Sequence, residues 1–385
     1  MMHFAAVVGA RPNFMKMAPL LRALDATPGV KTTLVHTGQH YDSQLSDVFF
    51  HDLDMRHPDI HLEVGSGKHG QQTARVLEKM EEALERGPGG GATYDRLIVV
   101  GDVNSTMAAT LAAVKLGVPV AHVEAGLRSR DRTMPEEINR IVTDSVSDML
   151  LVSEPAGLAN LKQEGHDDDH IHLVGNVMID TLLRQLPAAR ERRVLQPLGL
   201  TPGQYGVVTL HRPSNVDQRA ALEPLLDVLI DISRRLPLVF PVHPRTTARL
   251  ETFGLMDKFQ AAPGILQQPP MGYMEFLALT SQSKVIVTDS GGLQEESTAL
   301  GIPCLTLREN TERPSTVEVG TSTLIGNDPD KLRAHLEHVL DGTYKQGSCP
   351  ELWDGKAAER IAGVLVERGA GARRGRGAHA KVQRR

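Results

Sequence analysis

A run of small and polar residues follows a short apolar segment late in the chain. The apolar segment is Lys284–Val287, and Thr288-Asp289-Ser290-Gly291-Gly292-Leu293-Gln294-Glu295-Glu296 comes directly after it. This pattern predicts a buried strand, a tight glycine turn and a helix start, so that free backbone N–H groups and the positive helix end converge. Such a point binds anions, phosphate above all. Taken alone, the motif is equally compatible with an ordinary strand-to-helix turn of an α/β protein.

Three other expected strand ends in the second half of the chain carry His or Arg. They are His211-Arg212 after Gly206–Leu210, Val242-His243-Pro244-Arg245, and Thr311-Glu312-Arg313-Pro314 after Pro303–Leu307. Each one alone fits an ordinary surface residue. Beside the Ser290–Gly292 turn, they together predict a dianion held from several sides, and a diphosphate fits this description.

Carboxylates and further cations follow expected strand ends in the first half. Arg11 and Lys16 come after Phe4–Val8, Asp102 follows Arg96–Val100, and Glu124 directly follows Val118–Val123. Asp102 could cap the following helix or act as a base, and the capping role is the commoner one for an isolated Asp. Glu136 and Arg140 fall at i and i+4, so we expect them to form a pair on one helical face.

Several functions lose support from what the chain lacks. It has no Walker pattern, and the first turn, Gly-Ala-Arg-Pro-Asn-Phe, differs from Gly-x-Gly-x-x-Gly, which disfavours kinases and nicotinamide-dependent dehydrogenases. His122 and Glu124 share a strand face, but no further ligand cluster accompanies them, so we expect no metal site.

Short β-branched runs alternate with longer helical patterns along the chain. Further strand candidates are Thr33–His36, Met149–Val152 and Pro237–Val242. Alternation of this kind predicts parallel sheets with helices on both faces, in two doubly wound domains with a ligand-binding cleft between them. We place the domains at residues 1–185 and 186–367, with a polar, Pro-flanked linker over 186–198, and expect a disordered Gly/Arg-rich tail over 368–385.

Composition sets the wider limits. A chain of 385 residues with 41% hydrophobic residues exceeds what one core organises. The residues before Arg368 carry 35 Lys and Arg against 47 Asp and Glu, a net charge of −12, which argues against a nucleic-acid partner. With two cysteines, of which Cys304 is expected to be a buried thiol, and no long apolar run, we expect a soluble cytoplasmic protein without a membrane partner.

The motifs together resemble those of the non-hydrolysing UDP-N-acetylglucosamine 2-epimerases. The resemblance runs in order over roughly residues 4 to 360 and is therefore more specific than any single motif. It rests on Gly-Ala-Arg-Pro-Asn-Phe-Met-Lys-Met-Ala-Pro from Gly9, Thr-Gly-Gln-His from Thr37, Gly101-Asp102, His-Val-Glu-Ala-Gly-Leu-Arg from His122, Pro-Glu-Glu-Ile-Asn-Arg from Pro135, Asp-Ser-Gly-Gly-Leu-Gln-Glu-Glu from Asp289 and Thr-Glu-Arg-Pro from Thr311.

The resemblance implies a glycosyltransferase-B-type architecture of two Rossmann-like domains, a homodimer, and no metal or redox cofactor. It implies UDP-N-acetylglucosamine and UDP-N-acetylmannosamine as substrate and product. The implied acid/base residues are Asp102, Glu124 and Glu136, with His211 essential nearby. The implied substrate-binding residues are Arg11, Lys16, Arg140, Ser290, Gly291, Gly292, Glu296 and Arg313, with His243 at the diphosphate and the segment around Tyr273 and Phe276 at the uracil.

The family's reaction explains why such residues are needed. The C2 proton of the sugar is not α to a carbonyl, so UDP must leave C1 before that proton becomes acidic. Loss of the proton gives 2-acetamidoglucal, and UDP adds back after reprotonation on the other face. The reaction therefore needs stabilisation of the departing diphosphate and at least two acid/base groups.

The chain departs from the family pattern at three places. Many members have Gly-Thr-Arg-Pro-Glu at the first loop, where this chain has Ala10 and Asn13, and Gln-His-Arg-Glu-Met at the second, where it has Gln39-His40-Tyr41-Asp42-Ser43. The second loop is the region in which members bind an activating substrate molecule, so the resemblance does not carry that regulation to this chain. Met271 replaces a Gln of some relatives, so we expect the uracil to be held differently.

Four alternatives remain open at this stage. A retaining glycosyltransferase would share the architecture but gives no reason for clustered carboxylates in one domain. A hydrolysing epimerase differs only in its handling of water, and a 2-epimerase of a related UDP-2-acetamido sugar differs only in its sugar. A non-enzymatic nucleotide-sugar sensor would not need all of the expected carboxylates.

Overall fold

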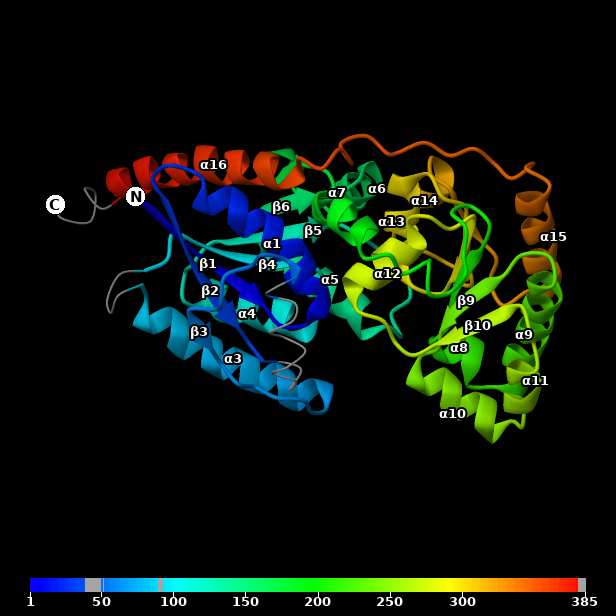
Figure 1. Ribbon diagram of the computed structural model, residues 1–385. Coiled ribbons are helices and arrows are strands. Elements are labelled where there is room, and N and C mark those ends of the chain that lie inside the picture. Colours follow the sequence, from blue (N-terminus) through cyan, green and yellow to red (C-terminus); the bar gives the residue numbers. More distant parts are fainter. Residues whose placement is uncertain (39–49, 51, 89–92, 380–385) are drawn as a thin grey trace. The chain divides into compact units, whose positions relative to one another are not determined.

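The computed structural model describes residues 1–38, 50, 52–88 and 93–379 and divides the chain into two compact units (Figure 1). Unit 1 comprises Met1–Thr181 and Glu351–Arg385, and unit 2 comprises Leu182–Pro350. Among the described residues, unit 1 has a 7-stranded sheet and unit 2 a 6-stranded sheet. All strand pairs are parallel, as the alternating sequence pattern predicted.

The strands of unit 1 follow the order β3-β2-β1-β4-β5-β6-β7. They are β1 Met2–Val8, β2 Val30–His36, β3 Ile60–His61, β4 Arg96–Val100, β5 Val120–Ala125, β6 Met149–Val152 and β7 Ile171–Leu173. The helices are α1 Arg11–Asp25, α3 His69–Arg86, α4 Asn104–Lys115, α5 Pro135–Val146, α6 Pro155–Gln163, the short 3₁₀ helix Asp168–His170, α7 Val177–Glu191, which continues into unit 2, and α16 Ala357–His379.

Small side chains let helix α4 pack closely on the sheet of unit 1. Ala108, Ala109, Ala112 and Ala113 are fully buried and belong to one core cluster with residues of β1, β4 and β5. Helix α3 contributes Val76 and Met80 to the same cluster, while its other face is polar. Close packing of α4 fixes the turn that joins it to β4, where Asp102 lies.

The strands of unit 2 follow the order β10-β9-β8-β11-β12-β13. They are β8 Gly206–Thr209, β9 Leu238–Pro241, β10 Ile265–Gln268, β11 Val285–Thr288, β12 Cys304–Thr306 and β13 Ser322–Leu324. The helices are α8 Pro213–Val216, α9 Arg219–Ser233, α10 Pro244–Thr252, α11 Met256–Gln260, α12 Tyr273–Thr280, α13 Gly291–Leu300, α14 Ser315–Glu318 and α15 Pro329–Leu340. Leucines of α9 and α15 pack together in the main core cluster of this unit.

The strands predicted from the sequence are confirmed to within three residues at each end. The short strands β3, β7, β10 and β13 were not predicted, because runs of two to four residues carry too little periodicity. Cys304 is a buried free thiol, as expected. No helix in the part of the chain that the structure describes is long and apolar enough to cross a membrane.

The division of the chain differs from the predicted domain boundaries in two respects. The expected linker begins inside helix α7, which continues through Pro187 to Glu191. The segment from Glu351 returns to unit 1, where α16 packs beside α1 (Figure 1). Asp180 accepts hydrogen bonds from the backbone N–H groups of Ala357 and Ala358 and so caps α16.

The expected tail of residues 368–385 overlaps the end of helix α16. Helix α16 is assigned as far as His379, so it includes residues 368–379, the first twelve residues of the expected tail. Glycine and arginine in this stretch argued against a helix on composition alone. Propagation from a helix that is already nucleated and packed on α1 is easier than starting a new one, which accounts for the difference.

Candidate active site

Three neighbouring strands place the acidic residues of unit 1. Strands β1, β4 and β5 are adjacent in the sheet and end at Val8, Val100 and Ala125. Asp102 follows β4 by two residues, and Glu124 is the penultimate residue of β5. Two of the three predicted acid/base carboxylates therefore lie at the carboxyl edge of the sheet, where doubly wound proteins bind ligands.

Glu124 has a backbone conformation that is unusual for a residue with a side chain. Its φ is 71°, and the register of β5 against β6 shifts between Val123 and Ala125, as at a β-bulge. The buried carboxylate forms an ion pair with Lys16 of α1. A left-handed conformation costs on the order of 1–3 kcal/mol and tends to persist at functional sites. The structure thus brings the predicted residues Lys16 and Glu124 into contact.

Gly101 provides the space for this ion pair. Its φ is +67°, and a Cβ atom there would lie 3.0 Å from Lys16 Nζ and 3.4 Å from Glu124 Oε2. Glycine satisfies both the positive φ and the close approach. Because Gly101 also joins β4 to Asp102, one turn helps to set the positions of both carboxylates.

Asp102 binds the guanidinium group of Arg140. Its Oδ2 accepts from Arg140 Nη2 at 2.9 Å and from Arg140 Nε at 3.1 Å. Helix α4 has Val103 as its N-cap residue, so Asp102 lies one residue before the cap position. The predicted pair of Glu136 and Arg140 is wrong, because Arg140 Nη1 donates to Glu137 at 2.6 Å.

Glu137 is a site residue that the sequence analysis missed. It is buried and also accepts hydrogen bonds from the backbone N–H groups of Ser129 and Arg130. Spacing of i and i+3 suits an ion pair as well as i and i+4 does, and burial of one carboxylate decides between them. Glu136 lies in the first turn of α5, half-buried, and among the described residues it has no hydrogen bond or ion pair to Asp102 or Glu124.

Asn13 closes the turn between β1 and α1. Its Oδ1 accepts from the backbone N–H groups of Gly9 at 3.2 Å and Ala10 at 3.1 Å, and its Nδ2 donates to Val100 O at 2.8 Å. A carboxylate could accept the first two bonds but could not donate the third. The departure from the family pattern at this position therefore ties the first loop to the end of β4.

Two predicted features lie partly or wholly outside the residues that the structure describes. Arg11 is the first residue of α1, so its backbone follows β1, but its side chain is outside the described part of the chain. The segment Gln39–Ser43 lies outside the described residues altogether.

In unit 2, Asp289 holds the turn after β8. Its Oδ2 accepts from the backbone N–H groups of His211 and Arg212, and its Oδ1 lies 2.7 Å from His211 Nδ1. Burial raises the pKa of Asp289, but the bonds from His211 and the backbone outweigh burial, so the pKa lies below its ordinary value. The carboxylate is therefore ionised, and His211 Nδ1–H donates to it.

His243 lies next to His211. The ring centroids are 5.5 Å apart. Burial and the neighbouring His211 lower the pKa of His243, which favours the neutral ring. Its Nδ1 accepts from the backbone N–H of Arg245 and caps helix α10.

The predicted phosphate turn is the start of helix α13. Ser290 is the N-cap residue and its hydroxyl makes no cap bond, so the first backbone N–H groups are not capped by a side chain. A Cβ on Gly291 would lie 3.0 Å from Arg313 Nη1, which brings that predicted cation to the helix start. No atom lies within 4 Å of a Cβ built on Gly292, and Glu296 is buried on the same helix.

A second arginine reaches the same helix start and was not predicted. Arg308 Nη1 lies 3.4 Å from the Cβ position of Gly291, is buried and has no hydrogen-bond partner among the described residues. The carboxylate of Glu312 bridges Arg308 Nη2 at 2.7 Å and Arg313 Nη1 at 2.6 Å. Arg308 directly follows Leu307, the last residue of an expected strand, and this position could have identified it from the sequence.

The expected uracil segment is mostly packed in the core. Tyr273 is buried at the start of α12, and Phe276 and Met271 are partly buried against apolar clusters of unit 2. One of these clusters contains Leu293 of α13, so Phe276 lies close to the helix that carries the phosphate turn. Uracil contact at this segment stays a prediction.

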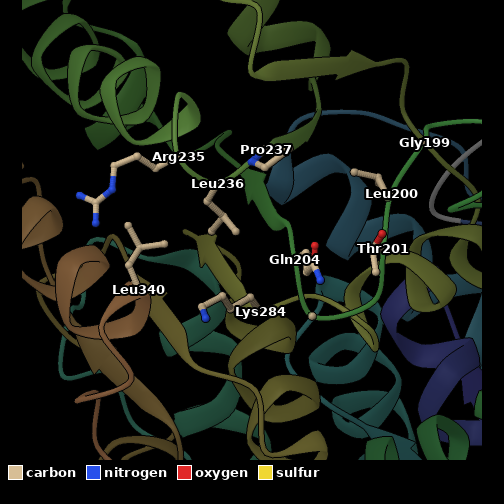
Figure 2. A pocket seen from close by; sticks show the side chains of 10 residues that line it. Gly199, Leu200, Thr201, Gln204, Arg235, Leu236, Pro237, Lys284 and Leu340 are labelled. Atoms are coloured by element: carbon tan, nitrogen blue, oxygen red, sulfur yellow. The ribbon is translucent and has the colours of Figure 1, made fainter.

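A cavity of about 370 Å³ lies elsewhere in unit 2, at the amino ends of its strands (Figure 2). Lys284, Gln204 and Leu236 are among the residues that line it, and none of the predicted site residues does. Parallel sheets bind ligands at the opposite strand ends, so this cavity is not the expected site. The described ranges contain no group of three or more His, Cys, Asp or Glu residues that could hold a metal ion.

Comparison with known proteins decides the family. The model of the UDP-N-acetylglucosamine 2-epimerase family matches residues 22–366. The chain belongs to this family. Its members are isomerases, and the two parallel α/β sheets are those of the glycosyltransferase-B-like two-domain fold.

Two relatives, and a crystal structure of one of them, show how far the similarity extends. The UDP-N-acetylglucosamine 2-epimerase of Methanocaldococcus jannaschii is 38% identical over 370 residues, which are 95% of this chain and 99% of the relative. The UDP-2,3-diacetamido-2,3-dideoxy-D-glucuronate 2-epimerase of Pseudomonas aeruginosa is 38% identical over 372 residues, 95% of this chain and 100% of the relative. A crystal structure of the M. jannaschii enzyme with UDP-GlcNAc and UDP has a TM-score of 0.83, covering 95% of this chain and 100% of that chain.

Proposed function

We propose that the chain interconverts UDP-N-acetylglucosamine and UDP-N-acetylmannosamine. UDP leaves C1, the C2 proton is removed to give 2-acetamidoglucal, and UDP adds back after a proton has been delivered to the other face of C2. The C1–O bond breaks with its electron pair on the diphosphate, and the same bond re-forms at the end, so the reaction needs no oxidant and no second substrate.

Two carboxylates with separate cation partners carry this proposal. Glu124 is paired with Lys16, and Asp102 is paired with Arg140. The two epimers carry the C2 hydrogen on opposite faces, so one group must remove a proton where another returns it. Glu136, half-buried and without an ion partner in the described part of the chain, is proposed as a third acid/base group.

The departing diphosphate is assigned to groups of unit 2. The start of α13 offers uncapped N–H groups, and Arg313 and Arg308 reach the same point. Asp289 orients the ring of His211, and this supports a role for His211 in stabilising charge as UDP leaves. We also assign substrate contacts to Arg11, Arg140, His243, Glu296 and the segment around Tyr273 and Phe276, and we propose that the enzyme acts as a homodimer.

A second substrate has support from one relative. The P. aeruginosa protein, whose name gives a UDP-diacetamido-dideoxyglucuronate as its substrate, is as similar to this chain as the M. jannaschii epimerase. The alternative function is therefore 2-epimerisation of a UDP-2-acetamido sugar with further substituents.

Turnover in deuterium oxide tests the proposal. Pure protein is incubated with UDP-N-acetylglucosamine, and in parallel with the diacetamido glucuronate sugar, and products are followed by proton NMR. We expect a UDP-linked manno product that carries deuterium at C2. Free N-acetylmannosamine with UDP would show a hydrolysing epimerase, turnover of the second sugar alone would show the alternative substrate, and binding without turnover would show a sensor.

Isosteric variants test whether the three carboxylates act as acids or bases in the reaction. We expect Asp102→Asn, Glu124→Gln and Glu136→Gln each to lower turnover by at least ~10²-fold, as for a lost general acid or base. Asp168→Asn is the matched control, because Asp168 is an exposed, ion-paired carboxylate of the same unit. Near-normal turnover in all three site variants would refute the assigned mechanism.

A further inference from the structure

His122 makes two hydrogen bonds, and both of its partners are acceptors. Its side chain is fully buried in β5. Nδ1 lies 2.6 Å from Asp144 Oδ1, and Nε2 lies 2.8 Å from the carbonyl oxygen of Gly101. A carbonyl oxygen has no proton to donate, so Nε2 must carry the hydrogen of that bond.

The charge of Asp144 decides whether Nδ1 of His122 also carries a hydrogen. Its Oδ2 accepts from the backbone N–H of Gly126 at 3.0 Å and lies 2.8 Å from Arg128 Nη1. The guanidinium of Arg128 and the backbone N–H of Gly126 favour the ionised form of this buried carboxylate. An ionised carboxylate can only accept, so Nδ1 of His122 must also carry a hydrogen.

The charges around this group agree with that state. Arg128 is buried between Asp144 and Glu164, whose Oε2 lies 2.6 Å from Arg128 Nη2. The Glu164 side chain is 31% exposed, so water shares in compensating its charge. With a charged ring, His122, Asp144, Arg128 and Glu164 alternate in sign and sum to zero.

We propose that His122 is held as an imidazolium ion and acts as a positioning residue for both Asp102 and Glu124. Its Nε2–H fixes the carbonyl of Gly101, which directly precedes Asp102. Through Asp144 it also fixes the N–H of Gly126, two residues after Glu124. Hydrogen bonds from a charged donor are stronger than neutral ones, so one buried cation holds the two turns in a fixed relation.

The two turns need such support because both are conformationally demanding. Gly101 and Gly126 have φ values of +67° and +80°, and Glu124 between them has 71°. Without the network, the backbone could relax from these values and move the carboxylates. A shift of about 1 Å in a catalytic group can cost on the order of 10²-fold in rate. This inference rests on the proposed function for its kinetic consequence, but not for the charge of the ring.

Nitrogen NMR of the ligand-free protein tests the charge directly. The protein is labelled with ¹⁵N at histidine, and the ring signals are assigned by their loss in His122→Gln. We expect both ring nitrogens of His122 to carry protons at neutral pH, with slow exchange because the side chain is fully buried. A ring with one bare nitrogen at neutral pH would overturn the proposal, whether or not the enzyme proves active on any UDP-sugar.

Kinetics test the positioning role. We expect His122→Gln to lower kcat by roughly 10–100-fold and to leave the dissociation constant of UDP unchanged, because the assigned diphosphate groups lie in unit 2. His3→Gln is the matched control, since His3 lies in the same sheet and the one hydrogen bond that its ring makes to described residues goes to Thr33. Asp144→Asn is the second variant and should show the same split if His122→Gln does not fold. A folded variant with an unchanged kcat would overturn the positioning role.

Discussion

The ring of His211 and the carboxylate of Asp289 hold each other in place. Nδ1 of His211 lies 2.7 Å from Asp289 Oδ1, while Asp289 Oδ2 accepts from the backbone N–H of the same histidine at 2.9 Å. Ring and backbone of one residue are thus tied to the two oxygens of one carboxylate. Nε2 remains on the outer side of a ring that is 40% exposed. This is the arrangement by which a carboxylate fixes the tautomer of a functional histidine.

Asp289→Asn should therefore impair turnover. An amide offers one acceptor oxygen where the carboxylate offers two, and it loses the charge-assisted bond to the ring, worth about 1.5–3 kcal/mol. We expect kcat to fall by roughly 10–100-fold, with a smaller change in KM. Asp217→Asn is the control in the same unit, because it removes an exposed carboxylate that pairs with Arg245 and Arg249. Equal, small effects of the two variants on kcat would contradict an orienting role for Asp289.

The two arginines at the start of α13 should contribute differently. Arg313 already binds Glu295 through Nε and Glu312 through Nη1, whereas Arg308 Nη1 is buried without a partner in the described structure. We expect Arg308→Gln to weaken UDP binding and to leave uridine binding unchanged, because the proposed function assigns the phosphates, and not the uridine, to this point. Isothermal titration with both ligands measures this. An equal loss for uridine would show that the variant disturbs the fold instead.

Arg313→Lys should affect catalysis more than binding. A lysine cannot bond to two carboxylates and a phosphate in the planar geometry of a guanidinium. We expect a loss on the order of 1.5–3 kcal/mol in kcat/KM, most of it in kcat, because the bond strengthens as UDP departs. Unchanged kcat with a raised KM would mean that Arg313 binds substrate and transition state alike, and no change in either would place it outside the site.

Much of the site was predictable because strand ends are easy to find. Apolar runs such as Arg96–Val100 mark the strands, and residues that follow them, Asp102 among them, must lie at one edge of a parallel sheet. What the sequence did not give was the choice of partner. Arg140 could pair with Glu136 or Glu137, and only the burial of Glu137 decides it.

Hydrogen-bond and ion-pair networks that cross the sheet could not be predicted from the sequence either. Asp144 lies in the last turn of α5, with no motif to mark it, yet it contacts His122, Gly126 and Arg128. The left-handed φ of Glu124 could not be predicted either, since a run such as Val-Glu-Ala looks like an ordinary strand. Long-range contacts and local strain are set by the packed fold and are weakly encoded in local patterns.

The free energy of unfolding should depend on pH because of Asp180. Burial raises the pKa of this carboxyl to about 6, against the two N–H bonds from Ala357 and Ala358. Below pH 4 the group is protonated in both the folded and unfolded chain, so its contribution is fully present. As pH rises toward 6, the unfolded chain loses the proton first and stability is lost, by about 3 kcal/mol in total.

Urea unfolding between pH 4 and pH 7 measures this effect. We expect Asp180→Asn to reduce the decline in the free energy of unfolding over that interval. Asp131→Asn is the control, because Asp131 also lies in unit 1 and hydrogen bonds from Thr133 lower its pKa instead of raising it. A decline of the same size in wild type and Asp180→Asn would show that other groups cause it.

The last prediction concerns the space that Gly101 leaves for Lys16 and Glu124. Alanine at this position must adopt a φ of +67° and would bring its Cβ within 3.0 Å of Lys16 Nζ. Gly117→Ala is a matched control, because Gly117 has a φ of +70° and no atom within 4 Å of its Cβ position. Both variants should lose about 1–2 kcal/mol of stability to the left-handed backbone, whereas only Gly101→Ala should displace Lys16 and lower kcat. Thermal unfolding and steady-state kinetics of the pair separate the two effects. Equal kcat values in the two variants would mean that the ion pair of Lys16 and Glu124 is not needed for turnover.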